Sequence, residues 1–145
     1  MQISTKFTIA VHILAATRFF EKDHKITSQF LASSIGSNPV IIRNIMTQLQ
    51  EAGIIDVKRG PGGITITRSL SEITFLDIYK AVETNSGDDL FRFHENPNLQ
   101  CPVGRNIHNA LDKSFAEIRD EFERELAAHD MQEVFDRIES AQKAE

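Results

Sequence analysis

The sequence predicts a mainly α-helical fold in which one short β-hairpin interrupts a series of helices. Apolar residues recur at intervals of three and four over most of the chain, and two β-branched runs flank a glycine-rich segment, residues 59–63. The 145 residues are 41% hydrophobic and 26% charged, which suits one globular domain with a helical arm and excludes a long multidomain enzyme. We expect most of the ten phenylalanines to lie inside.

The charge is distributed unevenly along the chain. Residues 1–68 hold eight Lys and Arg side chains against four Asp and Glu, whereas residues 69–145 hold eight against seventeen, within a net charge of −5. The basic half predicts a surface for phosphates, although chance clustering on solvated faces explains the same distribution. No apolar stretch approaches the roughly 20 residues that cross a bilayer, and the N-terminus lacks a signal-peptide pattern. We therefore expect a cytoplasmic protein with no membrane partner.

Three helices are expected in the first 53 residues. The first starts at the N-cap Ser4 and continues to Phe20, and the second follows the cap Thr27 and ends at Gly36. Asn38 and Pro39, a cap residue and a proline suited to the first helical position, begin the third helix almost at once. The apolar residues assigned to this third helix are Val40, Ile41, Ile45, Leu49 and Ala52, before Gly53. Two helices joined by so tight a turn are typical of a helix-turn-helix.

The rest of the chain predicts a winged helix-turn-helix domain followed by a long helix. Residues 54–58 and 64–68 form the expected hairpin, or wing, and a capping box of Thr74 and Asp77 starts a fourth helix. We divide the chain into the DNA-binding domain (1–84), a sensor or linker loop (85–101), and the dimerisation helix with a C-terminal helix (102–145).

The long helix is expected from about residue 102 to 129, and Asp130 with Glu133 caps the last helix. At roughly 25 residues it is about 38 Å long, more than the winged domain needs, so we expect it to pack against a second copy. The stripe expected in that dimer interface comprises Ile107, Leu111, Phe115, Ile118, Phe122 and Leu126.

Residues 38–43, 49–55, 59–63 and 73–83 together resemble the Rrf-two family of bacterial transcription regulators, and the resemblance covers nearly the whole chain. It implies a homodimeric winged-helix protein that binds double-stranded DNA, and we expect a repressor acting on a pseudo-palindromic operator. Cluster-binding members carry three cysteines before the long helix, whereas residues 85–104 here hold only Cys101. The resemblance is therefore to the clusterless, YwnA-like branch, and we expect no iron–sulfur cluster and no other cofactor.

The third helix is the expected recognition helix, because a helix-turn-helix places its second helix in the major groove. Arg43 suits guanine there and Asn44 suits adenine. Helix starts favour phosphates, and Arg59 in the glycine-rich wing suits a narrow minor groove. The predicted DNA-binding residues are Thr27, Ser28, Gln29, Asn38, Pro39, Val40, Arg43, Asn44, Thr47, Lys58, Arg59, Gly60, Gly62 and Gly63.

Cys101 is the candidate regulatory residue. It precedes Pro102 at a helix start, with Arg105 one turn on, so we expect a lowered thiol pKa and a response to oxidants or electrophiles. An inert packed cysteine is the other interpretation, and an unknown small-molecule effector in the 85–101 loop stays open. A mixed metal site of His94 and Cys101 with Glu95 or His108 lacks specific ligand spacing, so no metal is expected.

Two other classes of function fit the sequence less well. An enzyme is not expected, because Cys101 and His94 are the only candidate nucleophile and base and the winged domain leaves little room for a substrate pocket. A winged-helix module that binds a protein partner without DNA is the alternative. Such a module has no need for Arg43, Lys58 and Arg59 around a glycine-rich wing.

Overall fold

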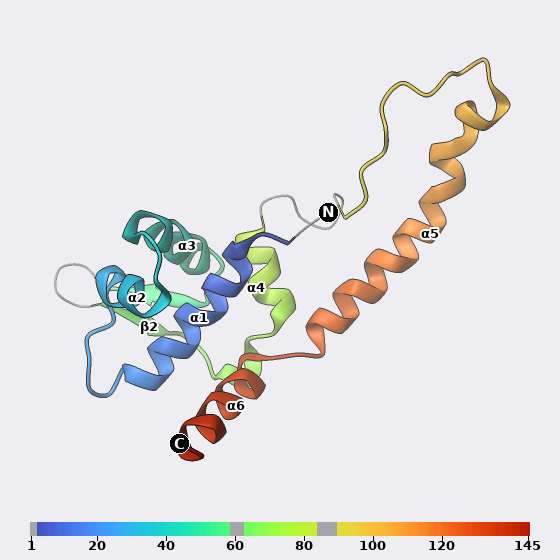
Figure 1. Cartoon of the computed structure of the whole chain (residues 1–145). Helices are drawn as coiled ribbons and strands as arrows, with labels where there is room; N and C mark the ends of the chain where they lie inside the picture. Colours follow the sequence, from blue (N-terminus) through green and yellow to red (C-terminus); the bar gives the residue numbers. More distant parts are fainter. Residues whose placement is uncertain (1–2, 59–62, 84–89) are drawn as a thin grey trace.

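The computed structural model describes residues 3–58, 63–83 and 90–145. Figure 1 shows a winged body, a long helix α5 that extends from it as an arm, and a last helix α6 that returns to the body. The elements are α1 (Thr5–Phe20), α2 (Ser28–Ile35), α3 (Pro39–Glu51), β1 (Ile55–Val57), β2 (Ile64–Ile66), the 3₁₀ turn η1 (Leu70–Glu72), α4 (Phe75–Val82), α5 (Pro102–Ala127) and α6 (Met131–Lys143). The expected mainly helical winged fold is confirmed. Within the described ranges, no helix is long and apolar enough to span a membrane.

The helices start at the side chains that the sequence predicts. Ser4, Thr27 and Asn38 cap α1, α2 and α3, and their side-chain oxygens accept backbone N–H groups of the first turn at 3.3, 3.1 and 2.8 Å. Both predicted capping boxes are formed, Thr74 with Asp77 and Asp130 with Glu133. Gly36 ends α2 at φ 75°, a left-handed conformation that lets the chain turn sharply into α3.

The hairpin pairs Ile55 with Ile66 and Val57 with Ile64 in antiparallel register. It forms a two-stranded sheet whose alternate residues face the helices, since Ile55 and Ile64 are buried while the intervening Asp56 and Thr65 are exposed. At the end of the hairpin, the Thr67 hydroxyl donates to the carbonyl oxygens of Gly53 and Ile54 at 2.6 and 2.9 Å. The wing is therefore attached to the C-terminal end of α3.

The core where α1, α3 and α4 meet is aliphatic. Its fully buried members include Ile13, Leu14, Ile42, Leu49 and Ile78. The expectation that most phenylalanines lie inside is wrong, because none of the ten is buried. Small buried alanines bring α1 close to its neighbours, so that branched aliphatic side chains fill the interior and the rings pack around its margin.

The apolar residues expected in α3 lie partly on its buried face and partly outside it. Ile45 and Leu49 are buried, and Ile42 and Met46 complete the buried stripe. Of the other apolar residues expected in this helix, Val40, Ile41 and Ala52 are exposed. The expected and the buried residues both recur at intervals of three and four, and only the packing against α1 and α4 selects between them.

The C-terminal helix returns the chain to the winged body. Met131, the first residue of α6, has an exposed fraction of 0% and belongs to the main core. Its backbone N–H donates to the carbonyl oxygen of Ile73, and the N–H of Phe75 donates to that of His129, each at 2.9 Å. These bonds join the start of α4 to the turn between α5 and α6, which we call the elbow (residues 128–131).

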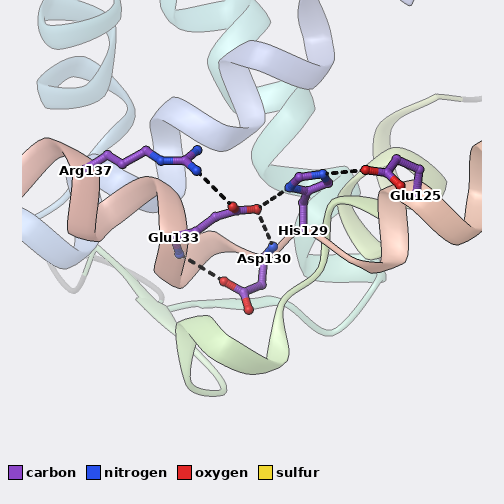
Figure 2. A network of polar contacts seen from close by, with 5 residues as sticks. All are labelled: Glu125, His129, Asp130, Glu133 and Arg137. Carbon is purple, nitrogen blue, oxygen red and sulfur yellow. Dashed lines mark hydrogen bonds and ion pairs between the residues drawn. The ribbon is translucent and has the colours of Figure 1, made fainter.

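A network of polar contacts surrounds His129 in the elbow (Figure 2). The ring nitrogen Nδ1 lies 2.7 Å from Glu133 Oε1, and Nε2 lies 3.0 Å from Glu125 Oε1. Arg137 pairs with the second oxygen of Glu133 at 3.4 Å, and the ring of Phe75 in α4 stacks on the imidazole. Hydrogen bonds to Glu125 and Glu133 raise the pKa of His129 above its ordinary value of 6.5.

We predict that His129 makes the stability of the protein depend on pH. Since its pKa is higher in the folded chain than in the unfolded chain, its contribution is fully present below pH 6.5 and is lost as the pH rises through the folded pKa. In urea unfolding from pH 5.5 to 8.5, about the range in which histidine titrates, the advantage of the wild type over His129→Gln should therefore shrink. The variant Glu125→Gln, which removes one partner, should show a weaker pH dependence. Parallel pH profiles for wild type and His129→Gln would contradict this prediction.

Candidate nucleic-acid interface

The face of α3 opposite its buried stripe carries four of the fourteen residues predicted to contact DNA. Val40, Arg43, Asn44 and Thr47 are all exposed on this face, and their spacing of three and four aligns them along the helix. The guanidinium of Arg43 and the amide of Asn44 thus lie on one side of the helix. These are side chains that form bidentate hydrogen bonds with guanine and adenine in a major groove.

Some polar groups at the start of α3 are engaged in capping the helix and are not free to contact DNA. Asn38 is exposed, but its Oδ1 accepts the N–H of Val40 at 2.8 Å, which leaves its amide N–H groups outward. Pro39 is half-buried and has no N–H, so the backbone at this end offers less to a phosphate than expected. The Thr47 hydroxyl donates to the carbonyl oxygen of Arg43 at 3.0 Å and keeps its lone pairs for an outside donor.

The base of the wing lies beside the start of α2, so two predicted contact regions form one surface. The N–H of Ile64 donates to the carbonyl oxygen of Ile26 at 3.0 Å, and that of Lys58 to the carbonyl oxygen of Gly63 at the same distance. Gly63 has φ +67°, and a Cβ there would stand only 2.8 Å from the oxygen of Ile26. A glycine is required at this position, since both the conformation and the close approach exclude a side chain.

The start of α2 retains backbone donors for an anion. Thr27 accepts the N–H of Phe30 at 3.1 Å, so its hydroxyl is engaged as a cap. Ser28 is half-buried and Gln29 is exposed. Among the described residues, no hydrogen bond satisfies the backbone N–H of either one. Free N–H groups at the positive end of a helix suit a phosphate, and the phosphate contact at the start of α2 stays a prediction.

Three further predicted residues, Arg59, Gly60 and Gly62, lie outside the described residues. Their roles in the wing stay predictions. Lys58, at the described edge of the same segment, is exposed beside Gly63.

Three further side chains, which were not predicted from the sequence, lie beside the predicted DNA-contact residues. Lys6 of α1 and Ile41 of α3 line an open groove together with Asn44 and Thr47. Lys25 lies beside the base of the wing, where its Cγ is 3.1 Å from the position of a Cβ on Gly63. Both lysines belong to the basic front half, but only the folded chain shows that they lie beside the predicted contact residues.

The arm formed by α5 contacts the body at its inner end, through α4. No residue of α5 is buried, and its predicted stripe is half-buried at five positions and 47% exposed at Ile118. Near the body, Phe122 packs edge-on against Tyr79 of α4. Further out, the preceding segment covers part of the stripe, with the ring of Phe91 stacked on that of Phe115 at 4.0 Å.

Cys101 caps the outer end of α5. Its side chain is exposed, and backbone N–H groups of Gly104 and Val103 lower the pKa of its thiol, while the slight burial acts in the opposite direction. The direction is the one expected for a helix start, but it arises from these amides rather than from Arg105. Cys101 is therefore an accessible thiol with increased thiolate character.

The candidate metal ligands do not assemble into a site. His108 Nε2 lies 3.2 Å from the backbone oxygen of His94, and the two rings meet edge to face. Over residues 3–58, 63–83 and 90–145, no group of three or more His, Cys, Asp or Glu side chains is placed to hold a metal ion.

Comparison with known proteins identifies the family of the chain. The profile of the Rrf2 family, described as iron-dependent transcriptional regulators, matches residues 3–137. The chain belongs to the Rrf2 family. It is 34% identical to the Bacillus subtilis protein named "Putative HTH-type transcriptional regulator YwnA", over 94% of this chain and 98% of that one. It is thus a DNA-binding transcription regulator and not an enzyme.

Two solved structures are similar to this chain. A crystal structure described as "a putative DNA binding protein" is 31% identical, with a TM-score of 0.70 over 89% of this chain and 97% of that one. A protein described as "a putative transcriptional regulator" from Lactobacillus plantarum is 24% identical and superposes with a TM-score of 0.75 over 99% of this chain and 100% of its own. This second structure shows that the two folds are alike.

The iron named in the family description has no matching ligand set here. A cysteine-ligated cluster needs several thiolates, whereas this chain has one cysteine, and that cysteine is exposed at a helix cap. The residues present do not fit such a cluster. That the protein works without a cofactor stays a prediction.

Proposed function

We propose that the protein is a cytoplasmic, homodimeric repressor that binds a pseudo-palindromic operator through two copies of α3 and two wings. The observation that carries the proposal is the exposed face of α3, on which Arg43, Asn44 and Thr47 lie opposite the buried stripe. The start of α2 and the base of the wing form one surface with donors and lysines for the flanking phosphates.

The arm supports a dimer. A 26-residue helix is about 39 Å long, and this one buries none of its residues within the chain. An apolar stripe on such a helix is stable in water when a second surface covers it. A second copy of the same stripe supplies that surface with two-fold symmetry, which matches a palindromic operator.

The alternative of a protein-binding module has less support. It explains neither the arginine and asparagine on α3 nor the lysines beside the wing. The relatives compared above bear names of DNA-binding proteins or regulators, and none is named as a protein-binding module.

Replacement of Arg43 tests whether the exposed face of α3 contacts DNA. Binding to the DNA upstream of the gene is measured by fluorescence anisotropy in a salt titration, and affinity should fall steeply with salt because phosphate contacts release counterions. Arg43→Ala, and likewise Arg59→Ala in the wing, should lose roughly 1–3 kcal/mol. Lys143→Ala, which removes an exposed cation from the end of α6, is the charge-matched control. Unchanged affinity in Arg43→Ala would remove α3 from the mechanism.

Replacement of Ile118 tests the dimer. Ile118→Lys places a charge in the centre of the stripe and should convert the dimer to a monomer in sedimentation equilibrium, because a buried unpaired charge is costly. Glu117→Lys, at an exposed neighbouring position, is the matched control and should stay dimeric. A dimeric Ile118→Lys variant would place the interface elsewhere.

Modification of Cys101 tests regulation through the sensor loop. With iodoacetamide, the thiolate sulfur forms a thioether and iodide leaves, and the rate should rise with pH at a lower midpoint in the folded chain than in urea. We expect the modified protein to lose operator affinity and Cys101→Ser to be unaffected by the reagent. Loss of binding in Cys101→Ser on the same treatment would show that Cys101 is not the responsive group.

A further inference from the structure

The first turn of α3 exposes two large aliphatic side chains side by side. Val40 is 51% and Ile41 is 45% exposed, although the same helix buries Ile42, Ile45, Met46 and Leu49 completely or nearly so. The interior side of α3 is thus already filled, and the two exposed side chains have no place in this core. Their exposure is a cost in water that a bound partner would remove.

The surroundings of this pair indicate what the partner is. Val40 stands between Arg43 and Asn44 on the outer face, and Ile41 shares a groove with Asn44 and with Lys6 of α1. Protein–protein interfaces are enriched in aromatic residues and depleted of lysine. The groove beside Ile41 has the opposite composition, since Lys6 and no aromatic side chain of the described residues line it. The arginine, the amide and the lysine are complementary to a polar, anionic surface. The apolar pair between them is complementary to a few apolar groups on that same surface.

The major groove of DNA is such a surface. Its base edges present hydrogen-bond donors and acceptors, and its characteristic apolar group is the C5-methyl group of thymine. Aliphatic side chains make no hydrogen bonds, so a thymine methyl is the base-edge group that they contact favourably. Val40 and Ile41 are consecutive and point about 100° apart on a helix, so they reach different base pairs.

We infer that Val40 and Ile41 read thymine, each through contact with one C5-methyl group in every half-site of the operator. This inference rests on the proposed function, since it requires α3 to enter the major groove. It adds Ile41 to the predicted contact residues and gives Val40 a defined target. The operator half-site therefore contains two thymines whose methyl groups, and not only their base pairing, contribute to affinity.

The test uses the full-length protein and two random duplex pools, one made with thymine and one with uracil, which pairs identically but lacks the methyl group. From the thymine pool, the wild type should enrich sequences with thymine at two positions of each half-site. From the uracil pool, the preference at those two positions should disappear, while the preferences at the other positions remain.

Single thymine-to-uracil changes in the enriched operator then assign the contacts. For the wild type, each methyl group removed should weaken binding about fourfold, the value of one buried methylene-sized group. Val40→Ala should lose this discrimination at one position and Ile41→Ala at the other, whereas Ile41→Val should retain it. Val103→Ala, which truncates a valine at the start of α5 that is 69% exposed, is the matched control and should discriminate as the wild type does.

The outcomes separate this inference from the proposed function. An enriched operator with equal affinity for thymine and uracil, or full discrimination in both Val40→Ala and Ile41→Ala, overturns the thymine contacts and leaves the regulator standing. Failure of the folded wild type to enrich any sequence from either pool overturns both, and favours a protein partner for the exposed pair.

Discussion

The rotation of α3 about its own axis is the constraint on which the interface depends. Ile42, Ile45 and Leu49 are almost completely buried, and they hold the helix with one stripe against α1 and α4. A turn of 100° in either direction would bury Arg43 or Asn44 and leave a charge or an amide without water. The packing energy of the core thus determines which side chains of α3 face outward.

The same core also fixes how the arm leaves the body. Met131 is buried among the residues that hold α1 and α4, and the elbow is bonded to the start of α4 on both sides of Thr74. The direction of α5 is therefore coupled to the winged body through a few short bonds and the ring stack of Phe75 on His129. In a dimer built on α5, this elbow sets the separation and orientation of the two α3 helices.

Local signals made the boundaries predictable. A cap is a contact within three residues, so Thr27, Asn38 and Asp130 could be assigned from the sequence alone. The exposed residues of α3 followed from the same helical period. In contrast, the run Val40-Ile41-Ile42 contains three apolar residues in succession, and a period of 3.6 cannot decide which of them faces the core. That choice depends on α1 and α4, which are distant in sequence.

Contacts between distant segments account for what the sequence did not predict. Lys6 comes to α3 because α1 packs across it, and the base of the wing meets the start of α2 through the Ile26–Ile64 hydrogen bond. The marginal position of the phenylalanines likewise depends on how closely the alanines of α1 let the helices approach. Sequence patterns predict helices, strands and caps, whereas the set of residues that share one surface is known only from the folded chain.

In the proposed regulation through Cys101, a signal travels along α5 from one end of this helix to the other. Cys101 lies at the outer end, and the elbow with His129 lies at the inner end. Between these two ends, α5 is one uninterrupted helix. Among the described residues, its outer part packs against the 90–101 segment, where Phe91 contacts Phe115 and Phe93 contacts His108. Such a helix transmits a change as a shift of the whole rod rather than as local repacking. In the proposed dimer, a modification at Cys101 would thus change the position of the α3 helices in two ways. It would shift α5 against α5 of the second copy, and it would move the elbow.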